Sequence, residues 1–135
     1  MPWSGWTHAP VKIAARTEIA SLPLIEAGQV YDATLNPAGN VMYAVEPGKL
    51  VNASAFGGMF RVRMGVAAKA GIALSGPTWV DGAHDGKALV STGHGHGPAC
   101  STIRKIVWFD LPAGETIIQL TGAVEPSVRF MMVTD

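Results

Sequence analysis

The chain has 135 residues, which suits one domain large enough to bury a hydrophobic core. Apolar residues make up 48% of the sequence and charged residues 15%, and ten basic residues balance ten acidic ones. These totals argue against a nucleic-acid partner, a transmembrane segment and an internal disulfide framework, because there is no basic excess, no long apolar run and only one cysteine.

The first 27 residues are predicted to form an N-terminal arm ahead of a β domain that spans residues 28–135. The first ten residues are rich in turn formers and contain Trp3 and Trp6. Residues 11–28 begin either as a short helix or as an extended segment, and Pro23 excludes a regular helix through their middle. We expect Trp3 and Trp6 to contact a ligand or partner, or to anchor the arm to the β domain.

Short alternating segments follow from residue 28 onward. Residues 28–49 predict a hairpin, because Pro37 and Gly39 form a turn between two alternating stretches. Residues 59–66, MFRVRMGV, predict the clearest strand of the chain, with apolar side chains on one face and two arginines on the other.

The second half of the chain repeats this pattern of short strands and tight turns. Residues 78–92 predict a second hairpin around the Asp85–Gly86 pair, which is a strong turn signal. Residues 103–110, 116–120 and 128–133 predict the closing strands. About eight to ten short strands with almost no helix indicate an all-β, antiparallel sandwich or jelly roll.

The stretch STGHGHGPACST, residues 91–102, is a candidate metal site. His94 and His96 share one face of an extended chain, Cys100 follows a proline bend, and His84 lies in the neighbouring hairpin. Two or three imidazoles and a thiolate suit zinc or copper, and such a loop also binds nickel adventitiously.

Two other interpretations of this stretch remain open. Glycine and proline form surface loops for backbone reasons alone, and histidines in such a loop need no ligand. In a catalytic interpretation Cys100 is a nucleophile with His94 or His96 as its base, although a lone cysteine is more often a small buried hydrophobe. The other two tryptophans, Trp79 and Trp108, lie in alternating segments and are predicted to be core residues. The alternative interpretation is that all four tryptophans form a sugar-stacking platform.

Residues 28–133 resemble a bacterial β-sandwich module of the pre-peptidase C-terminal type. The resemblance lies in three stretches, GQVYDATLNPAGNVMYAVEPG, TWVDGAHDGKALVST and VWFDLPAGETIIQLTG. It implies a secreted accessory module without catalysis, which binds or spaces other domains.

A second resemblance is to the cupins, which are double-stranded β barrels. Their first motif contains His-x-His followed by an acidic ligand, and here HGHGPAC places Cys100 at that ligand position. Their second motif contains Pro-x-Gly followed by a histidine, and here Pro112 and Gly114 match while Ile117 takes the place of the histidine. This resemblance implies a metalloenzyme that uses the same histidine-rich loop.

The leading hypothesis is therefore a non-catalytic binding or accessory module that recognises a partner protein or a glycan. We expect it to be periplasmic or extracellular, although the chain begins without a signal-peptide pattern. Near-zero net charge and an apolar composition favour a homo-oligomer or a subunit of a larger complex. The alternatives are a small zinc-, copper- or nickel-binding β protein and a cupin-type metalloenzyme.

Overall fold

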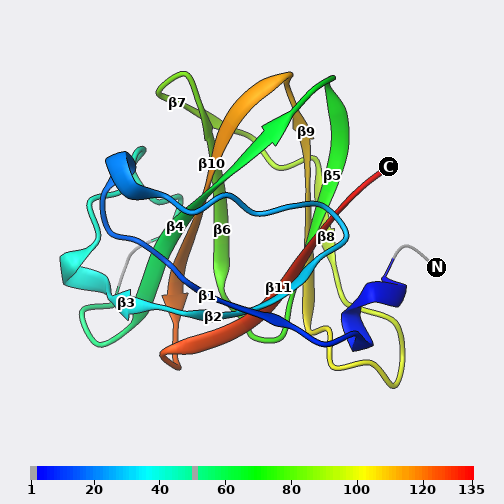
Figure 1. Ribbon diagram of the computed structural model, residues 1–135. Coiled ribbons are helices and arrows are strands. Elements are labelled where there is room, and N and C mark those ends of the chain that lie inside the picture. Colours follow the sequence, from blue (N-terminus) through cyan, green and yellow to red (C-terminus); the bar gives the residue numbers. More distant parts are fainter. Residues whose placement is uncertain (1–2, 50–51) are drawn as a thin grey trace.

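The computed structural model describes residues 3–49 and 52–135 and confirms the all-β prediction (Figure 1). Within these residues the helical turns are short 3-10 turns, η1 (Ser4–Thr7), η2 (Ile19–Ser21) and η3 (Ala38–Asn40). The strands are β1 (Val11–Ala14), β2 (Val30–Thr34), β3 (Asn36–Pro37), β4 (Phe56–Met64), β5 (Ala68–Leu74), β6 (Trp79–His84), β7 (Lys87–Leu89), β8 (Gly93–Gly95), β9 (Lys105–Leu111), β10 (Gly114–Ala123) and β11 (Ser127–Thr134).

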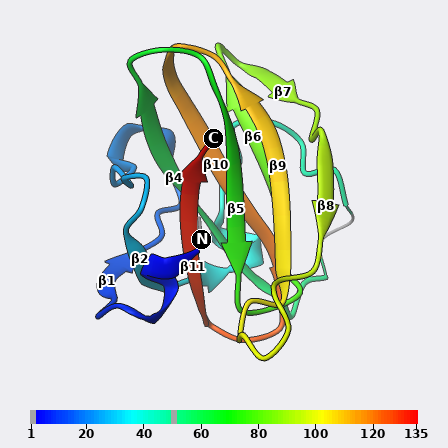
Figure 2. The same ribbon diagram turned by 90° about the vertical axis from the view of Figure 1, so that its right-hand side faces the viewer.

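The strands form two sheets packed face to face. The six-stranded sheet has the order β1-β2-β11-β5-β9-β8, and the five-stranded sheet has the order β3-β4-β10-β6-β7. Figure 2 looks onto the six-stranded sheet, with β11, β5, β9 and β8 side by side. The chain changes sheet at most connections, and the two runs of four strands, β2-β11-β5-β9 and β4-β10-β6-β7, have the strand order of a jelly roll.

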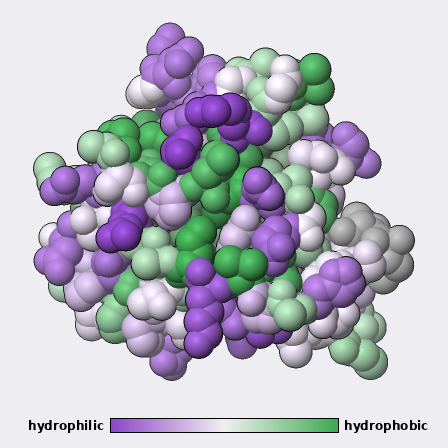
Figure 3. All heavy atoms as spheres, viewed as in Figure 1, coloured by the Kyte–Doolittle hydropathy of each residue, from purple (hydrophilic) through white to green (hydrophobic). Residues whose placement is uncertain are grey.

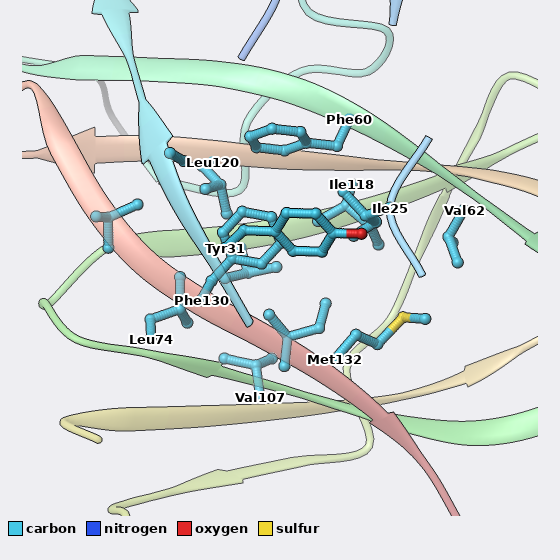
Figure 4. Close-up of a cluster of buried hydrophobic side chains, with 14 of the residues drawn as sticks. Ile25, Tyr31, Phe60, Val62, Leu74, Val107, Ile118, Leu120, Phe130 and Met132 are labelled. Atoms are coloured by element: carbon cyan, nitrogen blue, oxygen red, sulfur yellow. The ribbon is translucent and has the colours of Figure 1, made fainter. Parts of the chain in front are cut away.

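The core between the sheets follows directly from alternation along the strands. Ile118 and Leu120 of β10 are at most 1% exposed and point between the layers. Aromatic rings fill the centre, where the ring centroid of Phe130 lies 4.9 Å from that of Phe60 and 5.3 Å from that of Tyr31 (Figure 4). These contacts join β2, β4 and β11, which are far apart in the sequence, and so hold the two layers together.

A second apolar cluster lies on the outer face of the six-stranded sheet. The turn η1 covers this face, and its Trp6 is only 4% exposed. Trp3 is 8% exposed and meets Trp108 edge to face, with 6.0 Å between ring centroids. Met131 of β11 is fully buried beneath this cover, which explains why β11 is apolar on both faces. The N-terminal residues therefore pack on the β domain and also contribute β1 to its edge.

The outer face of the five-stranded sheet is covered by residues 41–48, which we call the strap. The Gln119 side chain of β10 is fully buried beneath the strap and bonds both backbone groups of Val45, accepting from its N–H at 3.0 Å and donating to its carbonyl at 3.1 Å. The Tyr43 hydroxyl donates to the Leu120 carbonyl at 2.9 Å. The predicted hairpin over residues 28–49 is therefore wrong, because β2 and β3 belong to different sheets and the strap pairs with neither.

The hairpin at residues 78–92 and the strand at residues 59–66 are confirmed in β6–β7 and β4. Asp85 and Gly86 have φ angles of 51° and 76°, as a two-residue turn with left-handed backbone requires. The prediction that Trp79 is a core residue is wrong, since its side chain lies on the outer face of β6 and is 36% exposed. Trp108 is half-buried under Trp3.

Candidate functional site

The histidine-rich loop lies between two separate hollows on the surface. We call the first the basic hollow; it has a volume of about 300 Å³ and is lined by Pro77, His94, Gly95, His96, Arg104 and Lys105. We call the second the Trp–Cys hollow; it has a volume of about 510 Å³ and is lined by Trp3, Ser4, Trp6, Thr7, Pro98, Ala99, Cys100, Ser101, Thr102 and Ile103.

The structure does not bring the four predicted metal ligands to one point. His94 and His96 share the basic hollow, whereas Cys100 lines the Trp–Cys hollow. His84 lies at the end of β6, where its Nδ1 is 2.9 Å from the Glu115 carbonyl and its Nε2 is 3.3 Å from a carboxylate oxygen of Asp85. Among residues 3–49 and 52–135, no group of three or more His, Cys, Asp or Glu side chains is arranged to hold a metal ion.

The Trp–Cys hollow lies where the N-terminal arm meets the loop that follows the two histidines. The indole Nε1 of Trp6 donates to the Thr102 hydroxyl at 2.8 Å, which ties η1 to the loop. The close packing of this loop requires a glycine at position 97, because a Cβ there would lie 2.4 Å from the Ile103 carbonyl oxygen. Cys100 adopts a left-handed backbone with φ of 63° and is exposed, so its thiol is accessible rather than buried in a core.

The predicted contact residues Trp3 and Trp6 are mostly covered by their own fold. Their rings fill the second apolar cluster, yet both residues still line the Trp–Cys hollow. The lining of the hollow therefore combines two tryptophans with the hydroxyl-bearing residues Ser4, Ser101 and Thr102. Apolar surface with a few polar groups at its edge is the usual character of a ligand-binding concavity.

The basic hollow contains residues that the sequence reasoning missed as site residues. Lys105 is half-buried, and its Nζ donates to the Thr78 carbonyl at 2.9 Å and lies 5.2 Å from the ring centroid of Trp79. Burial lowers the pKa of the Lys105 ammonium, and the nearby charge of Lys49 lowers it further. Arg104 and Lys105 are neighbours in the sequence, and neighbouring residues on one strand point to opposite faces, so alternation gives no signal that both line one hollow.

A third hollow, of about 480 Å³, lies beside a surface ion pair. The Arg129 guanidinium makes two bonds to the Asp32 carboxylate, with N–O distances of 2.8 and 3.2 Å. These bonds hold the pKa of Asp32 below its usual range. The two charged groups pair with each other, so they are better explained as a link between β2 and β11 than as a ligand site.

The surface also carries apolar side chains. Figure 3 shows hydrophobic surface through the centre of the face that Figure 1 presents, with hydrophilic side chains around it. Val11 on the edge strand β1 is 48% exposed and Ile19 in η2 is 54% exposed. Among the described residues, no helix has the length and apolar character needed to cross a membrane.

Comparison of the chain with models of protein families, with curated proteins and with solved structures finds no significant match. The resemblance to pre-peptidase C-terminal modules and the second resemblance to cupins therefore stay predictions.

Proposed function

We propose that this chain is a non-catalytic binding module that recognises a glycan or a segment of a partner protein. The observation that carries the proposal is the Trp–Cys hollow. Two tryptophans from the N-terminal arm and the loop that follows the histidines meet there, although more than 90 positions separate them in the sequence. Such a long-range junction, lined by tryptophans and hydroxyl-bearing residues, suits an apolar ring or side chain that also offers hydrogen-bonding groups.

Two features support a binding role for this hollow. The lining of the hollow is mostly apolar and includes Trp3, Trp6 and Ile103, which favours contact with apolar groups of a ligand. The jelly roll supplies a stiff support, because both sheets beneath the hollow are held by a close-packed aromatic core. The expectations of export and of a homo-oligomer or larger complex form part of this proposal, and the exposed apolar side chains of β1 and η2 favour association.

The single cysteine allows a direct test. A bulky maleimide on Cys100 fills the Trp–Cys hollow, whereas the same reagent on a C100S, V90C variant marks a site elsewhere, since Val90 is 86% exposed and does not line the hollow. Both labelled proteins are applied to an array of immobilised glycans. A benzophenone maleimide at the same two positions identifies a protein partner by cross-linking in extracts of the native host.

The proposal expects the Cys100 adduct to weaken glycan binding by at least about tenfold, or to cross-link one defined protein, while the adduct at position 90 does neither. If the two adducts behave alike in both assays, the hollow is not the binding site and the proposal fails.

A further inference from the structure

We propose that the basic hollow is a second binding site, which takes the sulfate or carboxylate group of an acidic saccharide, with Trp79 beside it as an apolar contact for the sugar ring. The inference goes beyond the proposed function, because the basic hollow shares no lining residue with the Trp–Cys hollow.

Two cations of the basic hollow lack an acidic partner within ion-pair distance. The ion pairs among residues 3–49 and 52–135 involve Arg61, Arg63, His84 and Arg129, and neither Arg104 nor Lys105 takes part in one. The charge of Asp81 acts on Lys105, and Glu125 lines a neighbouring hollow together with Arg104, but neither carboxylate forms an ion pair with these cations. The hollow thus has a local positive charge in a chain whose net charge is zero.

The surroundings of Lys105 disfavour its positive charge. Its ammonium is half-buried and near Lys49, and both conditions disfavour its charged form. An anion bound in the hollow would counteract both effects, since an opposite charge nearby favours the ammonium. The guanidinium of Arg104 is exposed and offers paired N–H donors that match the oxygens of a sulfate or a carboxylate.

The histidines and the proline complete the walls of the hollow. His94 lies on β8, where it is paired with Val107 of β9, and His96 follows two residues later. Both imidazoles are exposed in the hollow and able to hydrogen-bond hydroxyl groups in either tautomer. Pro77 adds apolar surface to the lining.

Trp79 favours a saccharide over an acidic peptide as the ligand. Its Nε1 donates to Asp81 at 3.0 Å, which fixes the ring, and the residue remains 36% exposed. Lys105 connects the indole to the basic hollow, with its Nζ 5.2 Å from the ring centroid. An apolar ring next to cations suits a sugar, whose ring carries apolar C–H surface and whose acidic group is attached to the same ring.

Titration calorimetry at pH 7.5, in low salt with a chelator present, tests the site with a heparin-derived tetrasaccharide and an oligogalacturonate. The first carries sulfate and carboxylate groups and the second carboxylate groups alone. The site variant is R104Q, and the matched control is K12Q, which removes the same charge from β1 at the opposite edge of the six-stranded sheet. Thermal unfolding verifies that both variants remain folded.

We expect R104Q to bind at least one of the two saccharides about five- to tenfold more weakly than the native chain, and K12Q to remain within about twofold. Binding of the tetrasaccharide alone assigns the site to sulfated sugars, and binding of both assigns it to acidic sugars in general. W79A is also expected to weaken binding of the same saccharide, while the Cys100 adduct leaves that binding unchanged.

Three results would overturn the inference. The first is equal loss of affinity in R104Q and K12Q, which would indicate non-specific attraction. The second is that inorganic sulfate or a polyglutamate peptide binds as tightly as the saccharides. The third is that neither saccharide binds the native chain. None of these results bears on the Trp–Cys hollow, so the two proposals fail separately.

Discussion

The strap over the five-stranded sheet provides the sharpest test of the architecture. Substitution Q119L replaces the glutamine with an apolar side chain of similar size and so removes both bonds to the Val45 backbone. Each net hydrogen bond contributes roughly 1 kcal/mol, and the abandoned Val45 groups add a desolvation cost that the new apolar contact of leucine partly offsets. We expect a loss of about 2 kcal/mol in the free energy of unfolding, which corresponds to a decrease of about 8 °C in Tm for a chain of this length.

The matched control lies on the same strand. Thr116 is also fully buried, but its hydroxyl has no hydrogen-bond partner, so T116V removes a buried polar group that makes no bond. We expect T116V to be neutral or slightly stabilising. Urea unfolding of the two variants measures the difference between a bonded and an unbonded buried polar group on one strand.

Hydrogen exchange separates local from global effects. In Q119L the Val45 amide should exchange faster than in the native chain, while amides at the centre of β10 keep their order of protection. Unchanged protection at Val45, or equal destabilisation by Q119L and T116V, would refute the idea that Gln119 holds the strap.

Three further predictions follow from the packing and the titratable groups. In G71A the new Cβ would lie 2.6 Å from the Trp108 ring, so the ring must move; we expect a loss of about 1–3 kcal/mol and a changed near-ultraviolet circular dichroism spectrum, and an unaltered spectrum would contradict this packing. The Arg129 bonds lower the pKa of Asp32, so this pair stabilises the fold above the unfolded carboxyl pKa near 4, and its contribution disappears as the pH falls through the lower folded value. D32N should therefore lose less than about 1 kcal/mol at pH 7, as measured by urea unfolding, and should flatten the stability profile below pH 4; a profile identical to that of the native chain would count against the pair. Burial raises the pKa of both tyrosines, so tyrosinate absorbance at alkaline pH should appear later in the folded chain than in the urea-unfolded chain, and stability should fall above a pH of about 10; coincident titration curves would show that the phenols are not buried as described.

Local pattern alone predicted most of the strands. Alternation along β4 and β10, and the Asp85–Gly86 turn between β6 and β7, are signals that a few neighbouring residues carry by themselves. A side chain on a strand faces the core or the solvent with a period of two, whichever strand becomes its neighbour. The all-β class and the two-layer core were therefore predictable from the amino-acid sequence.

Pairing between distant segments was decided only by the tertiary structure. The sequence of residues 28–49 has the alternation and turn of a hairpin, yet residues 41–48 lie across β10 because Gln119 and Leu120 supply partners for their polar groups. No local pattern shows that a buried glutamine on one strand matches a backbone 74 positions away.

In the candidate sites, too, the sequence identified individual residues and the tertiary structure decided which of them lie together. The sequence identified His94, His96 and Cys100 as unusual, and it predicted an arm that carries Trp3 and Trp6. Only the fold separates the histidines from the cysteine into different hollows and places Arg104 and Lys105 beside the imidazoles. The reason is physical: alternation is a property of a single strand, whereas a hollow is formed where several distant strands and loops bury their apolar surface together.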